Sequence, residues 1–327
     1  MLLDQHNRTV NYLRLSVTDK CNLRCFYCMP EEGIPFCKKE DELSFEEMLR
    51  ICRILTKQGV NKIRITGGEP FVRKDLLYFL RQLTELENPP ELSITTNATL
   101  LEPHIEELKN LGITSINVSL DTLDEARFFA ITRRDAFQQV NRNLNILLRE
   151  GFDVKVNCVV MENKNIEDII LLSELTKTAP VSVRFLEEMP FNAQTGEQTE
   201  LQWNYLHILE HLEAHYGPLV KLKDPQHSTS LNYSIPGYKG RIGIIPSFSR
   251  TFCGTCNRIR LSANGDFRTC LYGAAALNLR DEIRQPVTDG QLLQRIQNAL
   301  SHKPANGFMA ETQNTQHIKD SMAYLGG

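Results

Sequence analysis

Six short β-rich segments alternate with helical ones along the first two thirds of this 327-residue chain, and this series constrains the fold most. The segments begin at Asn11, Lys62, Glu91, Ser115, Asp153 and Val181. Amphipathic stretches between them, such as 44–59 and 105–112, end on glycine, which commonly terminates a helix. Repeated βα units predict parallel strands with right-handed crossovers. The expected fold is therefore α/β, a partial, open (βα)6 barrel of TIM type rather than a closed eight-fold one.

The side chains of the six segments divide into two faces of opposite character. One face is apolar throughout and comprises Leu13, Leu15, Ile63, Ile65, Ile94, Ile116, Val118, Val154, Val156, Val183 and Phe185. The other face is polar throughout and comprises Arg14, Ser16, Lys62, Arg64, Thr66, Ser93, Thr95, Asn97, Asn117, Ser119, Asp121, Lys155, Asn157, Ser182 and Arg184. Parallel strands that are covered on both sides normally read as near-continuous apolar runs. The polar face therefore needs its own explanation.

A polar face turned toward the inside of a barrel is costly unless water or a ligand satisfies it, because burying unpaired polar groups costs kilocalories per group. An antiparallel sheet with one wet face, or ion pairs at the barrel floor, would also give such a pattern. Its repetition across six strands favours a lumen that binds a ligand. The cations Arg14, Arg64, Lys155 and Arg184 predict that this ligand is anionic, and arginine suits phosphate oxygens particularly well.

Six of the nine cysteines form two tight groups. The first, CNLRCFYC, places Cys21, Cys25 and Cys28 in eight residues. A structural zinc ion takes four ligands, usually as two separated pairs, whereas three thiolates this close suit an iron–sulfur cube. No fourth ligand is nearby, which leaves one iron open to a substrate or cofactor at the mouth of the barrel. Of the other cysteines, Cys52 and Cys158 are interpreted as small core residues and Cys37 as an exposed thiol.

The second group, Cys253-x2-Cys256-x13-Cys270, again has three thiols and no local fourth ligand. An auxiliary zinc site, completed by Cys37 or a distant residue, is the alternative interpretation. Arg258 and Arg260 follow this group and would share one face of an extended chain, which suits an anionic substrate beside an open cluster. Because the βα pattern ends near residue 220, we expect a first domain over 1–220 and a smaller cluster-carrying domain over 221–327. Within the latter, 231–236 and 241–246 are predicted strands joined through GYKG.

The overall charge balance argues against a nucleic-acid partner. Lysine and arginine total 37 against 40 acidic residues, a net charge of −3, so no global basic field is present. No run of 18 apolar residues and no charged-then-apolar leader occurs, so we expect neither membrane insertion nor export, and a cytoplasmic location. In an unexported protein, nine cysteines indicate metal binding or burial rather than disulfides.

Two motifs together resemble the signature of the radical S-adenosylmethionine (SAM) superfamily. They are Cys21-x3-Cys25-x2-Cys28 with Tyr27 before the last cysteine, and Gly67-Gly68-Glu69-Pro70 at the end of the second predicted strand. The resemblance implies a partial (βα)6 barrel and a four-iron cluster whose open iron is chelated by the amino and carboxylate groups of SAM. It also implies that one electron from the cluster cleaves the sulfonium to give a 5′-deoxyadenosyl radical, the cofactor supplying the difficult chemistry.

Nearly end to end, the chain is similar to the GTP 3′,8-cyclase family of molybdenum cofactor biosynthesis. The similarity runs from SVTDKCNLRCFYCMP through RITGGEP, TTN and VSLD to the C-terminal cysteines and the final Gly326-Gly327. It implies two [4Fe-4S] clusters, the first holding SAM and the second holding the guanine of GTP. The radical would take the ribose H3′ of GTP, and bonding of C3′ to C8 would give 3′,8-cyclo-7,8-dihydro-GTP. Implied partners are a reductant such as a flavodoxin or ferredoxin and the downstream cyclic pyranopterin monophosphate synthase, and a homodimer is allowed.

By the same resemblance, residues of this chain receive roles. The cluster ligands are Cys21, Cys25, Cys28, Cys253, Cys256 and Cys270. The residues that would bind SAM are Tyr27, Gly68, Ser119 and Met189, and those that would bind GTP are Arg14, Arg64, Thr95, Lys155, Arg258, Ile259 and Arg260. Catalytic roles fall to Arg258, Arg260, Gly326 and Gly327. The alternatives are another two-cluster radical SAM enzyme acting on a different phosphorylated or peptide substrate, and a non-enzymatic zinc-binding module.

Overall fold

The six predicted strands are present, and they pair in chain order as a parallel series. The computed structural model describes residues 1–31, 33–189, 201–314 and 321–325. The series consists of β1 (Tyr12–Ser16), β2 (Lys62–Thr66), β3 (Glu91–Thr96), β4 (Ser115–Ser119), β5 (Asp153–Val160) and β6 (Ser182–Glu187). Every neighbouring pair in it is parallel. The prediction of six βα units is confirmed, and the antiparallel alternative for the polar face is excluded.

Strands from the C-terminal third extend both edges of this series. At the β6 edge lie β9 (Arg241–Ile245), β8 (Leu231–Ser234) and β7 (Val220–Lys221), and at the β1 edge lie β10 (Arg258–Leu261), β11 (Asp266–Arg268) and β12 (Leu277–Asn278). β9 pairs in parallel with β6, and β10 pairs in parallel with β1. The two strands predicted on either side of GYKG are β8 and β9, and they pair antiparallel. Among the described residues this gives one 12-stranded sheet whose end strands do not pair, so the barrel is open. The domain boundary at residue 220 stays a prediction.

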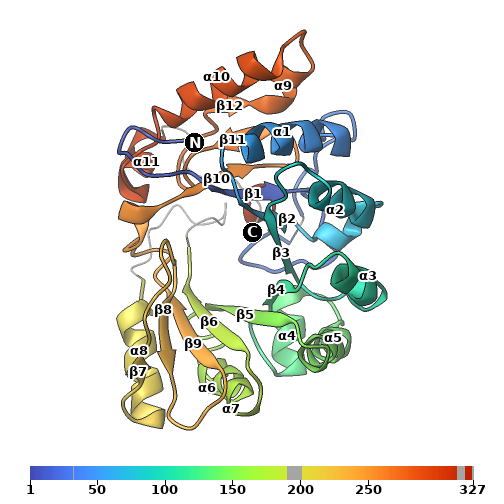
Figure 1. Ribbon diagram of the computed structural model, residues 1–327. Helices are drawn as coiled ribbons and strands as arrows, with labels where there is room; N and C mark the ends of the chain where they lie inside the picture. Colours follow the sequence, from blue (N-terminus) through green and yellow to red (C-terminus); the bar gives the residue numbers. More distant parts are fainter. Residues whose placement is uncertain (32, 190–200, 315–320, 326–327) are drawn as a thin grey trace.

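Helices connect the parallel strands and lie on the outer side of the curved sheet (Figure 1). Those of the βα series are α1 (Phe45–Lys57), α2 (Leu76–Thr84), α3 (Ile105–Asn110), α4 (Glu125–Thr132), α5 (Phe137–Arg149), α6 (Asp168–Ser173) and α7 (Leu175–Thr178). Later come α8 (Tyr205–Tyr216), α9 (Leu279–Ile283), α10 (Asp289–Leu300), α11 (Gly307–Gln313) and α12 (Met322–Leu325), and the short 3-10 turns are η1 (Pro70–Val72), η2 (Glu102–His104) and η3 (Cys253–Thr255). The start of α1 is set by Ser44 and Glu47, which form a capping box.

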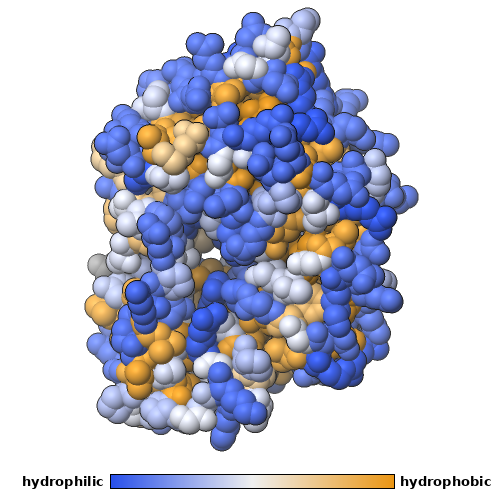
Figure 2. Space-filling view, viewed as in Figure 1, coloured by the Kyte–Doolittle hydropathy of each residue, from blue (hydrophilic) through white to orange (hydrophobic). Residues whose placement is uncertain are grey.

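The apolar strand face forms the core, as predicted from its alternation. Each of its eleven residues is at most 1% exposed. Cys52 and Cys158 are buried in the same core, whereas Cys37 is partly buried rather than exposed, and its amide donates to Asp19 Oδ2 at 2.5 Å. With the apolar face against the helices, the polar face lines the inside. The space-filling view shows a central hollow on this face of the molecule, rimmed mostly by hydrophilic residues (Figure 2). None of the helices in the described ranges has the length and apolarity needed to span a bilayer.

Candidate active site

Three arginines lie side by side on the inner face of the sheet. Arg260 on β10 and Arg64 on β2 are both register partners of Arg14 on β1, which lies between them. Neighbouring strands are about 4.8 Å apart, so these like charges crowd into one layer. Burial, with smaller contributions from the charges of Arg64 and Arg258, lowers the pKa of Arg14 to about 10. Burial, with Arg14 and Arg258, likewise lowers the pKa of Arg260. A layer of this kind is stabilised by an anion placed over it.

Two more cations lie on the inner face of the sheet, on strands β5 and β6. Lys155 on β5 donates to Ser115 Oγ at 3.1 Å and forms an ion pair with Asp153. Arg184 on β6 has a buried Nε with no hydrogen-bond partner among the described residues. Burial, together with the charge of Arg64, lowers the pKa of Arg184 to about 10. The predicted inward placement of the lumen cations is thus what the fold produces, and Arg184 in particular has unused hydrogen-bonding capacity.

Other inner-face side chains carry buried polar atoms that have no partner within the described part of the chain. They are both amide atoms of Asn117, Asn157 Oδ1, Ser182 Oγ, and Nε and Nη2 of Arg258. Each buried, unsatisfied donor or acceptor costs about 1–3 kcal/mol. A set of them on one face therefore indicates a lumen whose polar groups are satisfied by water and a polar ligand rather than by the protein itself.

The first cysteine group folds into a turn directly after β1. The amides of Cys28 and Met29 both donate to the carbonyl oxygen of Cys25, at 3.0 and 2.9 Å. Cys21, Cys25 and Cys28 all line one cavity of about 220 Å³. Burial raises the pKa of Cys21 to about 12 and also raises the pKa values of Cys25 and Cys28. In the absence of metal these thiols are protonated, so metal binding here releases protons.

The glycines of the GGEP motif let the end of β2 pass close to the loop that carries Cys21. The amide of Gly68 donates to the carbonyl of Thr18 at 2.8 Å, and the amide of Glu69 donates to that of Lys20 at 2.8 Å. A Cβ added at Gly68 would lie 2.4 Å from the Lys20 carbonyl oxygen. Only glycine fits this approach, which explains the motif in steric terms.

Glu69 ties the ends of β2 and β3 to the first cysteine group. Its fully buried carboxylate accepts from the amide of Phe71, the hydroxyl of Thr96 and the amide of Asn97, at 3.2, 2.8 and 2.7 Å. The side-chain amide of Asn97 in turn lies 3.8 Å from Cys21 Sγ. Burial raises the pKa of Glu69 to about 7. This network was not predicted as part of the site, although the polar strand phase had placed Asn97 on the inner face.

The structure gathers most of the predicted site residues around the same cavity. Tyr27, Gly68, Ser119 and Met189, the four residues expected to bind SAM, line it together with the first triad. Arg14, Thr95 and Arg260 from the set expected to bind GTP also line it. The remaining members of that set, Arg64, Lys155, Arg258 and Ile259, are not among its lining residues.

Ile259 and the two C-terminal glycines were also predicted to be site residues. Ile259 has 0% exposure and alternates with Arg258 and Arg260, so its side chain faces the core and leaves only its backbone for a ligand. Gly326 and Gly327 lie outside the described residues.

Several cavity residues were missed. Asp121 accepts the Tyr27 hydroxyl at 2.7 Å and the Val159 amide at 2.9 Å, and burial raises its pKa to about 6. Its inward strand phase was a usable signal. Met322 and Ala323 of α12 also line the cavity, and no sequence pattern pointed to them.

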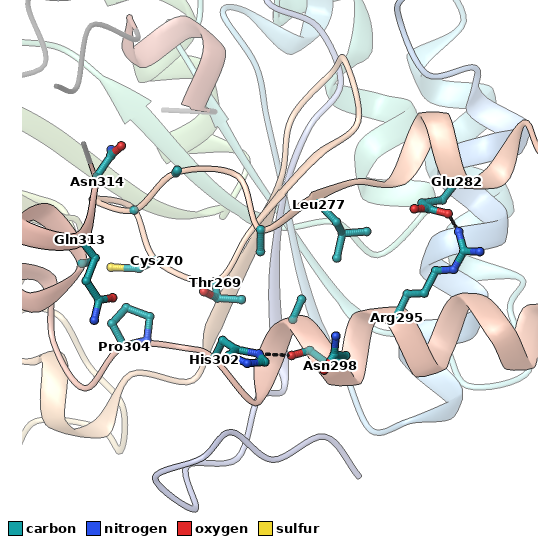
Figure 3. Close-up of a pocket in the computed structure, with 15 residues that line it drawn as sticks. Thr269, Cys270, Leu277, Glu282, Arg295, Asn298, His302, Pro304, Gln313 and Asn314 are labelled. Carbon is teal, nitrogen blue, oxygen red and sulfur yellow. Dashed lines mark hydrogen bonds and ion pairs between the residues drawn. The ribbon is translucent and has the colours of Figure 1, made fainter. Parts of the chain in front are cut away.

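The second cysteine group lies beside β10 and β11. Cys253 is in η3, the amide of Cys256 donates to the Cys253 carbonyl at 3.1 Å, and Cys270 follows β11. Burial raises the pKa of the Cys256 thiol, but the positive charges of Lys303 and Arg258 outweigh it and bring the pKa to about 7. Cys270 also lines a second pocket of about 560 Å³, which is separate from the cavity of the first triad (Figure 3).

The donor sets of both groups fit clusters better than single ions. Within the described part of the chain, no three histidine, cysteine or carboxylate side chains are arranged to hold one metal ion. A closed zinc site would need four such ligands around one point, whereas a four-iron cube spaces its three ligand sulfurs more widely. Leu271, which follows Cys270, lines the cavity of the first triad along with Arg260. The segment that follows Cys270 therefore forms part of the wall of that cavity.

Two family models match the chain. One is described as the radical SAM superfamily and matches residues 15–175, and the other is described as molybdenum cofactor synthesis C and matches residues 181–309.

Among curated relatives, a GTP 3′,8-cyclase of Clostridium botulinum is 36% identical and is covered over 100% of both chains. A mitochondrial GTP 3′,8-cyclase of Arabidopsis thaliana is 39% identical over 100% of this chain and 84% of its own. Molybdenum cofactor biosynthesis protein 1 of Bos taurus is 41% identical over 92% of this chain and 48% of its own, so the chain spans about half the length of that relative.

Among solved structures, SuiB of Streptococcus suis superposes with a TM-score of 0.61 over 96% of this chain and 77% of its own, at 15% identity. The same protein bound to S-adenosylmethionine gives a TM-score of 0.60 at 16% identity over 97% of this chain and 72% of its own. At this level of identity the likeness shows the fold alone. It adds no weight to a peptide substrate.

Proposed function

Because the chain belongs to the GTP 3′,8-cyclase family within the radical SAM superfamily, we propose that it converts GTP to 3′,8-cyclo-7,8-dihydro-GTP in molybdenum cofactor biosynthesis. The observation that carries the proposal is the layer of Arg260, Arg14 and Arg64 on the inner face, two of which line the cavity that also holds the first cysteine triad. An anion-binding layer beside a cluster site is what a radical reaction on a nucleoside triphosphate requires.

In this proposal Cys21, Cys25 and Cys28 hold a [4Fe-4S] cluster with one open iron. When bound, a cluster held by Cys21, Cys25 and Cys28 would supply the one-electron chemistry that cleaves SAM and allows hydrogen abstraction from C3′ of GTP. The protein's part is to position the two molecules. Gly68 allows the β2 backbone to approach the cluster loop, and Tyr27, Ser119 and Met189 line the remaining wall. Leu23 and Met29, buried at this end of the cavity, exclude water from the reacting atoms.

The cationic layer binds the triphosphate in this proposal. Guanidinium groups form paired, charge-assisted hydrogen bonds to phosphate oxygens, each contributing about 1.5–3 kcal/mol. Arg14, Arg64 and Arg184 supply guanidinium donors and Lys155 supplies an ammonium donor, from four strands in all. Burial and, after it, repulsion from neighbouring cations lower the pKa values of Arg14 and Arg184, and a bound anion would offset both costs.

In this proposal Cys253, Cys256 and Cys270 would hold the second [4Fe-4S] cluster, which would supply a binding site for the guanine ring. Arg258 and Arg260 on β10, which lie between Cys256 and Cys270 in the sequence, are the register partners of Tyr12 and Arg14 of β1. Nucleotide held at both ends would place its ribose at the middle of the cavity. The proposal further includes a flavodoxin or ferredoxin as reductant, cyclic pyranopterin monophosphate synthase as the next enzyme, and a cytoplasmic location.

The decisive experiment is anaerobic incubation of the reconstituted protein with SAM, a reductant and GTP deuterated at C3′. We expect one deuterated 5′-deoxyadenosine for each cyclised nucleotide formed. Cleavage of SAM with GTP unchanged would leave a radical SAM enzyme of another substrate, and the cyclase proposal would be wrong.

Iron analysis separates the cluster proposal from the zinc alternative. Unmodified protein should hold about eight irons, in two four-iron clusters. Cys253→Ser should lose about half of them, whereas Cys37→Ser, which replaces a partly buried cysteine outside both triads, should lose none. Zinc in place of iron, or equal losses in the two variants, would contradict the assignment.

A further inference from the structure

A lysine is buried beside the second cysteine triad. Lys303, which follows α10, is only 2% exposed. Its ammonium donates to the carbonyl oxygen of Arg258 at 2.9 Å and to that of Thr269, and it lies 3.9 Å from Cys256 Sγ. Figure 3 labels the chain neighbours of this lysine, His302 and Pro304, among the residues that line one pocket together with Thr269 and Cys270.

The backbone around Lys303 is held in place by the N-terminal arm of the chain. The side-chain amide of Gln5 donates to the Lys303 carbonyl at 2.8 Å. Arg8 donates to the Pro304 carbonyl at 2.7 Å and, through its other terminal nitrogen, to the Cys253 carbonyl at 3.0 Å. Arg8 is itself paired with Asp4 at 2.6 Å. The lysine is therefore fixed relative to the cysteine loop by contacts on both sides.

A buried ammonium is costly unless a negative charge lies close to it. Within the described part of the chain, the hydrogen-bonding partners of the Lys303 ammonium are two carbonyl oxygens and one sulfur. Carbonyl oxygens carry only partial charge. Of the three partners only Cys256, as a thiolate ligand, can supply a full negative charge. The burial of Lys303 is thus explained if the sulfur beside it is a metal-bound thiolate.

Among the residues that the structure describes, no cationic side chain donates a hydrogen bond to a sulfur of the first triad. Its described hydrogen bonds to sulfur come from neutral donors, namely the amide of Leu23 and the side-chain amide of Asn97 to Cys21, with the Ser321 hydroxyl 3.9 Å from Cys28 Sγ. A cationic donor to a ligand sulfur stabilises the reduced, more negative state of a cluster more than a neutral donor does. The two sites therefore differ in the donors to their sulfurs, although each offers three cysteine ligands.

We propose that Lys303 is a positioning residue for the C-terminal triad: it joins the segments that carry Cys256 and Cys270, and it raises the reduction potential of the cluster bound there. The inference rests on the proposed second cluster. Lys303 contacts no substrate in this account. It acts through Cys256 and through the carbonyls of Arg258 and Thr269, which hold the two ends of the ligand loop together.

The test uses the full chain with Cys21, Cys25 and Cys28 replaced by alanine, so that only the C-terminal centre gives an electron paramagnetic resonance signal. Redox titrations compare this protein with Lys303→Met, which removes the charge at similar length, and Lys303→Arg, which retains it. We expect Lys303→Met to make reduction about tenfold less favourable, a decrease of about 59 mV for one electron. Lys303→Arg should restore most of that change. Gln5→Ala, at an exposed residue that orients the Lys303 backbone, should shift the potential in the same direction by less.

An unchanged potential in Lys303→Met with full iron content would overturn the proposal. Loss of iron in a folded Lys303→Met but not in Lys303→Arg would support it, and equal loss in both would overturn it. If Lys303→Met does not fold, the potential of Gln5→Ala decides, a decrease supporting the proposal and no change overturning it. Absence of any iron–sulfur signal with Lys303 intact would instead refute the second cluster of the proposed function, and this inference with it.

Discussion

Replacing Arg184 by methionine is expected to change nucleotide affinity and protein stability in opposite directions. Arg184 lies on the inner face of β6, its Nε is buried without a partner among the described residues, and burial together with the charge of Arg64 lowers its pKa to about 10. An arginine whose pKa is lowered by folding holds its proton less strongly in the folded state. At pH 7 it is charged in both states, so its charge destabilises the folded protein without ligand.

The magnitudes follow from these quantities. A decrease from 12.5 to about 10 corresponds to about 3 kcal/mol at 1.36 kcal/mol per pH unit, and the partial exposure of this side chain reduces the figure to about 2 kcal/mol. Methionine keeps most of the aliphatic packing, so Arg184→Met should raise the melting temperature by a few degrees. Loss of a charge-assisted hydrogen bond to phosphate costs about 1.5–3 kcal/mol, which weakens GTP binding about 10- to 150-fold.

The assay is anaerobic calorimetric titration with GTP and with guanosine, alongside thermal unfolding without nucleotide. Guanosine has no phosphate, so its affinity should be the same in the variant and the unmodified protein. Lys57→Met, which removes an exposed cation paired with Glu87 on the outside of the barrel, is the matched control and should leave both affinities unchanged. An Arg184→Met variant with unchanged affinity for GTP would refute the reasoning. So would a variant that melts several degrees lower and whose affinities for guanosine and GTP fall by the same factor.

Three further predictions concern the cavity and its ends. Gly68→Ala should lower the melting temperature and the iron content of the first triad, because its Cβ would collide with backbone, whereas Gly290→Ala on α10 has room and should lose neither; equal losses would contradict this. Burial raises the pKa of Asp121 to about 6 in the folded protein. Its contribution to stability is therefore fully present when the pH is below the ordinary pKa near 3.8, and it is lost as the pH rises through 6. Asp121→Asn should therefore flatten urea-unfolding stability of the metal-free protein between pH 4 and 6, and parallel curves would disprove the assignment. Removal of Gly326 and Gly327 should abolish cyclisation in the anaerobic assay, and a truncated chain with full activity would show that the tail is dispensable.

The sequence determined the strands and their two faces, because alternation along a strand is a local property. Strand β5 begins at Asp153, as predicted, and Arg14, Arg64, Lys155 and Arg184 were assigned inward from strand phase alone. The two cysteine groups and the glycines of GGEP could also be recognised from short stretches of sequence. Gly68 illustrates why, since the motif exists to avoid one steric contact between neighbouring loops.

Only the tertiary structure decided which of these elements meet. The pairing of β10 with β1, which sets Arg260 beside Arg14, joins residues more than 240 positions apart and has no signal in either segment. The same holds for Lys303 beside Cys256 and for α12 at the cavity wall. Local pattern fixes which face of an element is polar, whereas the partner of that face depends on burying all the apolar faces at once, and that condition is satisfied only by the folded chain.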